Sequence, residues 1–422
     1  MMRISVVGTG YVGLTTAVGF ASRGHDVTCL DIDKKKVESL RAGRCPIYEP
    51  GLGELLSEVI KAGRFRAESD PSCLAESDLI FICVGTPSKQ DGSIDLTQLR
   101  QASEDIARNL RGEYPVIVVK STVVPGTTES TVIPTVERIS GRKAGKGFGV
   151  CVNPEFLREG RALEDFFHPD RVVIGELTRR EGDMLERPYG DFRCPILRTN
   201  LRTAEMIKYA SNAFLAARVS LINEIGNLCK LLGIDTREVA RGVGLDKRIG
   251  PHFLSSGIGF GGSCFPKDVK ALIAKGREMG YEMEILRAVL EVNEDQPLRL
   301  IPLLEKHLGR LEGKRIGVLG LAFKPDTDDV REAPSLKVVS HLLRMGAKVR
   351  AYDPKATENF KKHFPNIEYC ASAREVLDSD AVLILTEWQE FEKLDYSGKI
   401  VVDGRGVEAA RKTAKIYEGV CW

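Results

Sequence analysis

The feature that most constrains the fold is a glycine pattern placed between an apolar strand and a helix. Residues 3–7 (RISVV) read as a buried strand, and the segment 8–13 (GTGYVG) follows at once. A helix-compatible run begins at residue 14, and a second strand at 26–30 is followed by Asp31. This is the G-x-G-x-x-G pattern in the strand–turn–helix setting that a dinucleotide-binding βαβ unit requires. The sequence therefore predicts that the chain begins with an α/β domain.

The same pattern predicts the kind of cofactor. Glycines let the backbone approach a pyrophosphate, while the helix N-terminus supplies N–H donors and positive potential. The carboxylate of Asp31 would accept hydrogen bonds from ribose hydroxyls and repel a 2′-phosphate, which favours NAD over NADP. The alternative is a glycine turn that holds no ligand. The predicted contacts within this unit are Gly8, Gly10, Tyr11, Val12, Gly13 and Asp31.

Strands and helices continue to alternate beyond the first unit, which is typical of a parallel α/β sheet. Further strands are predicted at 79–83, 116–119, 149–152 and 172–175. A long helix is then predicted at 201–232, with Gly226 as a point where it can break, and a second helical stretch at 267–293. The helix at 201–232 would be about 45 Å long, which suits a link between domains or a dimer interface. Another α/β region follows, with strands predicted at 315–319, 349–352, 381–386 and 399–403.

Composition excludes several classes of protein. The chain has 422 residues, and Lys plus Arg number 61 against 59 for Asp plus Glu, so its net charge of +2 gives no general attraction to nucleic acid or anionic lipid. It contains no run of 18 apolar residues and no signal-peptide pattern, so we expect no membrane span. Ten cysteines without CxxC or zinc spacing indicate reduced thiols in a cytoplasmic protein and no metal site.

A second candidate site lies at 257–268 (GIGFGGSCFPKD), where four glycines precede Cys264. Pro266 stands where the first turn of a helix would begin. A cysteine at a helix N-terminus beside Lys267 should lose its proton readily and act as a nucleophile. Asp268 follows by one helical turn and can face the same side. The glycines could also let the backbone crowd against a phosphate. The alternative is a buried structural cysteine beside a turn.

Four further polar residues are weaker candidates. Thr86 and Thr122 follow predicted strands, where ligands of open α/β sheets bind, although each hydroxyl could instead cap a helix or a turn. Lys208 and Asn212 lie four residues apart on the long helix and can point into one pocket, or they can belong to a solvated face.

An NAD site combined with an activated thiol limits the chemistry. Loss of a hydride from an alcohol carbon gives an aldehyde, to which a thiolate adds to form a thiohemiacetal. This adduct again carries hydrogen on an oxygen-bearing carbon, so a second hydride can leave and produce a thioester, which water hydrolyses to an acid. The residues thus predict a four-electron oxidation. The competing hypotheses are a two-electron alcohol dehydrogenase and an inactive sensor that binds NAD.

Longer motifs carry a resemblance across almost the whole chain. They are VVGTGYVGL at 6–14, PIYEPGL at 46–52, KSTVVPGT at 120–127, NPEFLREG at 153–160, PDRVVIG at 169–175, EMIKYASNAFLA at 205–216, GFGGSCFPKD at 259–268, FKPDTDDVREAPS at 323–335 and DGRG at 403–406. On these motifs the chain resembles the UDP-glucose 6-dehydrogenase branch of the UDP-glucose/GDP-mannose dehydrogenase family.

The resemblance implies catalytic roles for six residues. Cys264 matches the nucleophile, and Asp268 and Thr122 match the pair that positions a water for proton transfer in the first oxidation. Lys208 matches the group that stabilises oxyanions, with help from Asn212, and Glu155 matches the residue that assists thioester hydrolysis. A lysine near a developing alkoxide is physically sensible, because electrostatic stabilisation is often the largest catalytic effect.

The resemblance also implies binding residues and an assembly. For NAD it adds Lys36, Thr86, Thr122, Glu159 and Arg331. For the sugar nucleotide it gives Glu155, Phe156, Leu157, Lys208, Asn212, Phe253, Ser255, Gly261, Lys324 and Arg405. Arg248 matches an arginine that reaches the substrate of a neighbouring subunit, so a homodimer or a higher homo-oligomer is expected.

The implied fold and substrate follow from the same resemblance. We expect two Rossmann-like doubly wound α/β domains joined by a long central helix and a helical dimerisation region. The expected domains are 1–198 for NAD, 199–296 for the central region with the cysteine loop, and 297–422 for the UDP-sugar. The expected substrate is UDP-glucose. The segment TVVPG at 122–126 departs from the commoner TVPVG of that branch, so GDP-mannose or UDP-N-acetylmannosamine stays open as an alternative with the same mechanism.

Overall fold

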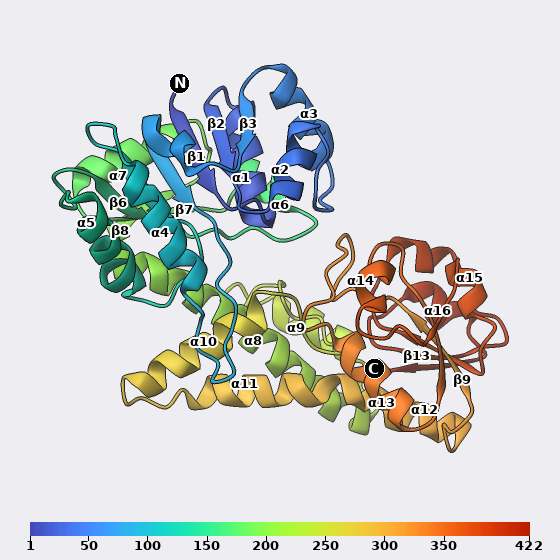
Figure 1. Cartoon of the computed structure of the whole chain (residues 1–422). Helices are drawn as coiled ribbons and strands as arrows, with labels where there is room; N and C mark the ends of the chain where they lie inside the picture. Colours follow the sequence, from blue (N-terminus) through green and yellow to red (C-terminus); the bar gives the residue numbers. More distant parts are fainter. The chain divides into compact units, whose positions relative to one another are not determined.

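The computed structural model describes residues 1–422, and the chain divides into two compact units, residues 1–211 and residues 212–422 (Figure 1). The division falls within helix α8 (Leu201–Leu232), which is unbroken. The predicted break at Gly226 does not occur. A Cβ atom on Gly226 would lie 2.9 Å from the Cys421 side chain, so this glycine serves close packing within the second unit.

The first unit is built on a sheet of eight strands in the order β3-β2-β1-β4-β5-β6-β7-β8. The strands are β1 (Arg3–Val7), β2 (Asp26–Leu30), β3 (Phe65–Glu68), β4 (Leu79–Ile82), β5 (Val116–Val119), β6 (Gly149–Val152), β7 (Val172–Glu176) and β8 (Ile196–Asn200). Its helices are α1 (Tyr11–Ser22), α2 (Lys34–Arg41), α3 (Leu52–Lys61), α4 (Thr97–Asn109), α5 (Ile133–Ser140), α6 (Ala162–Phe167) and α7 (Arg179–Glu186). The chain order reverses between β1 and β4, which is the point where doubly wound sheets bind ligands.

One pairing in this sheet differs from the parallel arrangement that the strand pattern predicts. Strands β6 and β7 run antiparallel, whereas all the other neighbours are parallel. The connection at 153–171 does not cross the sheet, because β7 begins at the same edge at which β6 ends. The sequence motif at 153–160 therefore stays at the carboxyl edge of the parallel strands.

Alternation along the strands explains how helices cover both faces of the sheet. Alternate residues such as Val6, Phe81 and Val118 share a core with Phe20 of α1 and Leu185 of α7. Helices α4 and α5 pack against each other over the opposite face (Figure 1). The central strands are buried on both sides, as expected for a parallel sheet between two helical layers.

The second unit contains a parallel sheet of six strands in the order β11-β10-β9-β12-β13-β14. The strands are β9 (Arg315–Leu319), β10 (Lys348–Tyr352), β11 (Glu368–Tyr369), β12 (Ala381–Ile384), β13 (Ile400–Asp403) and β14 (Ile416–Gly419). The helices around this sheet are α12 (Leu300–Leu308), α13 (Pro334–Arg344), α14 (Thr357–Lys361), α15 (Ala373–Val376) and α16 (Glu408–Thr413). The order repeats that of the first six strands of unit one, so the prediction of two doubly wound domains is confirmed.

Helices precede the second sheet in this unit, namely the end of α8, α9 (Thr236–Gly244), α10 (Phe265–Glu278) and α11 (Glu284–Asp295). The single helical stretch predicted at 267–293 is wrong, because a turn separates α10 from α11. Gly280 in that turn has a φ of +74°, a conformation that glycine adopts without steric cost. No helix of the chain combines the length and apolar character needed to span a bilayer.

Candidate active site

The glycine loop after β1 has the geometry of a dinucleotide cradle. Gly8 has a φ of +98°, and a Cβ atom there would lie 2.7 Å from the carbonyl oxygen of Cys83. A Cβ atom on Gly13 would lie 1.9 Å from the oxygen of Gly8. A Cβ atom on Gly10 would meet nothing within 4 Å, so packing does not demand a glycine there. The loop thus fits the pattern in which the second glycine lets a pyrophosphate approach the backbone.

Asp31 lies next to this loop at the end of β2. Its Oδ2 accepts hydrogen bonds from the backbone N–H of Thr9, at 2.9 Å, and from the Thr9 hydroxyl. Its Oδ1 accepts from the N–H of Asp33 at 2.9 Å. The Asp31 side chain is half-buried beside the loop, where the NAD prediction places it. Lys36 stands close by in sequence, half-buried in the first turn of α2.

The corresponding acid of the second unit, Asp353 at the end of β10, is used differently. Its Oδ2 accepts from the N–H groups of Leu321 and Ala322 and from the indole N–H of Trp388, at 2.7 to 3.0 Å. Its Oδ1 accepts from Lys355 and Ala356. A carboxylate offers about four acceptor positions, so this one is saturated by the protein itself. The two sheets share their topology, but Asp353, unlike Asp31, has no acceptor position left for a ligand hydroxyl.

The ends of β4 and β5 bring two predicted residues together. The hydroxyl of Thr86 donates a hydrogen bond to the carbonyl oxygen of Thr122 at 2.8 Å. Thr86 is buried and Thr122 half-buried. The turn role that the sequence left open for Thr86 therefore exists, and it also places the two threonines side by side.

The loop after β6 places a carboxylate against the lysine of the long helix. The Lys208 ammonium lies 2.9 Å from Oε1 of Glu155, and these side chains are only 5% and 6% exposed. Oε2 of Glu155 accepts from the N–H of Leu157 at 2.6 Å. The ring of Phe156 has the Lys208 ammonium 5.5 Å and the Arg171 guanidinium 3.7 Å from its centroid. The structure thus gathers Glu155, Phe156, Leu157 and Lys208, while Glu159 further along the loop is half-buried.

Lys120 is a second buried cation in this region, and the sequence motifs did not single it out. It directly follows β5, and its ammonium donates to Oδ1 of Asn153 at 2.8 Å, an oxygen that also accepts from the Tyr189 hydroxyl. Burial lowers the pKa of Lys120 to about 8, although nearby Cys83 and Glu155 partly oppose this shift. The sequence feature that could have marked Lys120 is its position at a strand end, immediately before Ser121 and Thr122.

Cys264 occupies the N-cap of α10, and Pro266 lies in the first turn as predicted. Asp268, which is 1% exposed, accepts from the side-chain N–H of Asn212 at 2.6 Å and from the Lys267 ammonium at 2.6 Å. The second unit therefore assembles Cys264, Asp268 and Asn212. The Lys267 ammonium, which stands beside Cys264 in the sequence, is paired with Asp268. The Ser263 hydroxyl lies 3.6 Å from the Cys264 sulfur.

The glycines before Cys264 pack against protein. A Cβ atom on Gly257 would lie 2.7 Å from the Gly404 oxygen, and one on Gly261 would lie 2.3 Å from the Glu332 oxygen. A Cβ atom on Gly262 would lie 2.8 Å from the ring of Phe323. The protein itself therefore requires the small size of these glycines, and a phosphate at this loop stays a prediction.

Aromatic rings surround the start of α10. Phe253, with a φ of +59°, lies 6.1 Å from the ring of Phe265, and Phe260 lies 5.7 Å from the same ring. Ser255 is exposed on the same loop. Arg248 is also exposed, at 89% of its side chain, and pairs only with its sequence neighbour Asp246 within the described contacts.

The second sheet carries the last predicted residues at its carboxyl edge. Arg405 donates to the carbonyl oxygens of Leu385 and Phe323 at 2.9 and 3.3 Å. Asp403 holds the turn around it by accepting from three backbone N–H groups, and burial raises the pKa of Asp403 to about 6. The Lys324 ammonium lies 5.5 Å from the Phe323 ring centroid. Arg331 forms a bidentate pair with Asp329.

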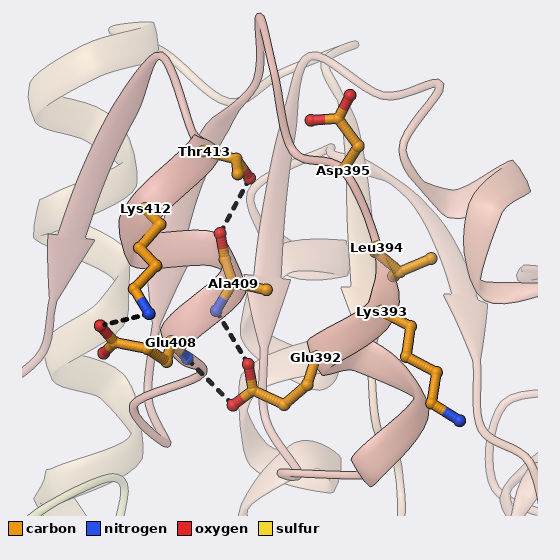
Figure 2. A pocket seen from close by; sticks show the side chains of 8 residues that line it. All are labelled: Glu392, Lys393, Leu394, Asp395, Glu408, Ala409, Lys412 and Thr413. Carbon is orange, nitrogen blue, oxygen red and sulfur yellow. Dashed lines mark hydrogen bonds and ion pairs between the residues drawn. The ribbon is translucent and has the colours of Figure 1, made fainter.

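A pocket elsewhere on the second unit contains none of these residues (Figure 2). It lies between α16 and the short 3-10 helix at Gln389–Lys393. The Glu392 carboxylate accepts from the N–H groups of Glu408 and Ala409 at 3.0 and 2.8 Å (Figure 2). The Glu392 carboxylate therefore caps the N-terminus of α16.

Comparison with known proteins identifies the family. The model of the UDP-glucose/GDP-mannose dehydrogenase family matches in three parts: its NAD binding domain at 2–193, its central domain at 202–295 and its UDP binding domain at 317–409. A UDP-glucose 6-dehydrogenase of Haloferax volcanii is 45% identical over 97% of this chain and 98% of its own length. A GDP-mannose 6-dehydrogenase of Pseudomonas aeruginosa is 39% identical over all of both chains.

A solved structure agrees with these sequence matches. The structure of a UDP-glucose dehydrogenase from Pyrobaculum islandicum has a TM-score of 0.96 and 49% identity, covering 100% of this chain and 98% of that one. The cradle at Gly8–Gly13 and these matches define an NAD-dependent oxidoreductase. The chain belongs to the UDP-glucose/GDP-mannose dehydrogenase family.

Proposed function

We propose that this chain oxidises UDP-glucose to UDP-glucuronate in two steps, through a thiohemiacetal and a thioester on Cys264. The observation that carries the proposal is the placement of Cys264 at the N-cap of α10 with the buried Asp268 and Asn212 beside it. The similarity to proteins named UDP-glucose 6-dehydrogenase supports the choice of sugar nucleotide. The proposed domains are 1–198, 199–296 and 297–422.

The proposed chemistry divides among the residues of the two units. NAD, when bound at the Gly8–Gly13 loop, accepts a hydride in each of two oxidations. Asp268, with Thr122, positions the water that takes the proton of the substrate hydroxyl. The Cys264 thiolate adds to the resulting aldehyde carbon, and the carbonyl oxygen takes up a proton to give the thiohemiacetal. Each oxidation removes a hydride and a proton from the substrate.

The second oxidation leaves a thioester, which must be hydrolysed. Glu155 assists attack by water on the thioester carbon, the carbon–sulfur bond breaks, and the Cys264 thiol and a carboxylate are released. Lys208, with Asn212, stabilises the negative charge that develops on oxygen. The buried Lys208–Glu155 pair is suited to this work, because charges excluded from water interact more strongly than exposed ones.

The binding residues are proposed from the same correspondence. For NAD they are the 8–13 loop with Tyr11 and Val12, Asp31, Lys36, Thr86, Thr122, Glu159 and Arg331. For the sugar nucleotide they are Phe156, Leu157, Phe253, Ser255, Gly261, Lys324 and Arg405.

A panel of sugar nucleotides tests the choice of substrate. NADH formation would be followed with UDP-glucose, GDP-mannose and UDP-N-acetylmannosamine at matched concentrations. We expect the highest kcat/KM with UDP-glucose. A higher kcat/KM with either of the others would transfer the proposal to that substrate, and absence of NADH with all three would favour the sensor hypothesis.

Replacement of Asp31 by alanine should weaken the preference for NAD over NADP by about tenfold, since it removes the charge that repels a 2′-phosphate. Asp31→Asn is the matched control, because it keeps an acceptor for the Thr9 N–H. The ratio of kcat/KM for the two cofactors would be measured in each variant. An unchanged ratio in both would contradict the assignment of Asp31.

We also propose a homodimer formed through α8. Its exposed apolar side chains recur at helical spacing, at Phe214, Leu221, Ile225, Leu228 and Leu232. A second copy of this helix would bury this stripe in a two-fold interface. Arg248 would then be the residue that reaches the neighbouring substrate.

A charge placed in this stripe should dissociate the dimer. Leu228 is 57% exposed in the isolated chain, so Leu228→Glu should not disturb a core yet should oppose association. Leu343→Glu on α13 is the matched control on another helix. Sedimentation velocity should give a dimer for the wild type and the control and a monomer for Leu228→Glu. A monomeric wild type would refute the proposal.

A further inference from the structure

The loop that leads to Cys264 is buried but lies outside every strand and helix. Residues 257–262 are all buried, and their backbone belongs to no sheet or helix ladder. Buried N–H and C=O groups must find partners, because leaving them unpaired is costly. The partners of this loop therefore reveal what determines its position.

Three side-chain amides bond this loop directly and a fourth orients one of them, and we call these four residues the amide clamp. It consists of Asn223 and Asn227 on α8, Asn293 on α11, and Gln296 at the start of the following 3-10 helix, Gln296–Arg299. Asn223 and Gln296 are fully buried. Asn227 and Gln296 exchange two hydrogen bonds, at 2.8 and 3.2 Å, which orients the Gln296 amide.

The amide clamp holds two residues of the loop at both of their backbone polar groups. The N–H of Gly257 donates to Asn223 at 2.7 Å, and its carbonyl oxygen accepts from Gln296 at 2.7 Å. The N–H of Phe260 donates to Asn293 at 2.8 Å, and its carbonyl oxygen accepts from the same amide at 3.0 Å. These bonds replace the ladder that a neighbouring strand would provide.

Steric contacts make this arrangement specific to the loop. Gly259 has a φ of +88°, and a Cβ atom there would lie 2.6 Å from Oδ1 of Asn293. Glycine therefore lets the backbone come close enough for the amide to bond Phe260 on both sides. The Phe260 ring in turn contacts Phe265, the residue next to Cys264, edge to face at 5.7 Å. Through this ring contact, Asn293 also helps to fix the position of the N-cap of α10.

We propose that Asn293 and Gln296 are positioning residues for the Cys264 nucleophile. The proposal rests on the proposed function in one respect, namely that it takes Cys264 as the nucleophile. Positional errors of about 1 Å at a reacting group can cost about a hundredfold in rate. A loop held by three amides, one of them oriented by Asn227, keeps the thiol in place before substrate binds and needs no rearrangement during the reaction.

The test compares Asn293→Asp and Gln296→Ala with the wild type. Asn293→Asp keeps the acceptor for the Phe260 N–H but turns a second oxygen towards the Phe260 carbonyl, so one attraction becomes a repulsion. We expect kcat to fall by about ten- to a hundredfold, with KM for NAD within about twofold. Gln101→Ala on α4 is the control, because it deletes an exposed amide.

A second readout requires no sugar nucleotide. The rate of Cys264 alkylation by iodoacetamide, measured by peptide mass spectrometry, should rise several-fold in Asn293→Asp and Gln296→Ala, since a released loop exposes a half-buried thiol. A purely structural role would lower Tm and leave both kcat and the alkylation rate of the folded enzyme unchanged, and that result would overturn the proposal. Unchanged kcat alone, with faster alkylation, would also overturn it.

The two proposals fail in distinguishable ways. If UDP-glucose yields no NADH, the proposed substrate is refuted. The alkylation rates still test the amide clamp, because they require no sugar nucleotide. If the variants do not fold, hydrogen exchange measured on the wild type tests the amide clamp instead. The amides of Gly257 and Phe260 should then be among the slowly exchanging groups of the second unit, and rapid exchange at either would contradict the clamp.

Discussion

Replacement of Cys264 by alanine should abolish acid formation, with a fall of about 10⁴-fold or more in the rate at which the acid is produced at saturating sugar nucleotide. Without the thiol there is no covalent adduct for the second oxidation, and the free aldehyde has no route to a thioester. Turnover would be followed by absorbance of NADH and the product analysed by mass spectrometry.

Cys194→Ala is a suitable control for this variant. Cys194 is also a half-buried free thiol, but burial raises its pKa, so it is a poor nucleophile. It should retain wild-type turnover. If Cys264→Ala still converted sugar nucleotide to acid, the role proposed for this residue would be wrong.

Replacement of Lys208 by alanine should lower kcat by about 10²- to 10³-fold and change KM for the sugar nucleotide far less. The reason is that a buried ammonium gains most when negative charge develops on oxygen in the transition state. The variant also leaves the buried Glu155 carboxylate without its partner, which costs about 3–5 kcal/mol of stability.

A double variant separates these two effects. Lys208→Ala combined with Glu155→Gln removes the uncompensated charge, so it should recover much of the lost Tm. It should not recover kcat, because the ammonium is still absent. Weaker sugar-nucleotide binding with unchanged kcat in Lys208→Ala would contradict a role in transition-state stabilisation.

The strands near the middle of each sheet were predictable because they are buried on both faces. β1, β5 and β9 coincide with the predicted apolar runs at 3–7, 116–119 and 315–319. β8 (ILRTN) and β14 (IYEG) were not predicted, because they lie at sheet edges and carry polar or half-exposed residues. The antiparallel β6–β7 pair could not be predicted from strand composition, since direction depends on the connection and not on the strand itself.

The residues of the candidate site that belong to compact motifs were found from sequence, and those that act through distant contacts were not. Cys264 and Asp268 lie one turn apart, and Gly8 and Asp31 flank one βαβ unit. Asn293 and Gln296 lie 33 and 39 residues from their partners in the loop. On a helix, isolated amides look like any polar face, so only the fold reveals what they bind.

The central claim is a four-electron oxidation, and its most direct test is an anaerobic endpoint assay with purified protein, excess NAD and limiting UDP-glucose. We expect two NADH for each UDP-glucose consumed, with UDP-glucuronate as the product. One NADH per sugar nucleotide, with an aldehyde as the product, would contradict the thioester route and leave a two-electron alcohol dehydrogenase.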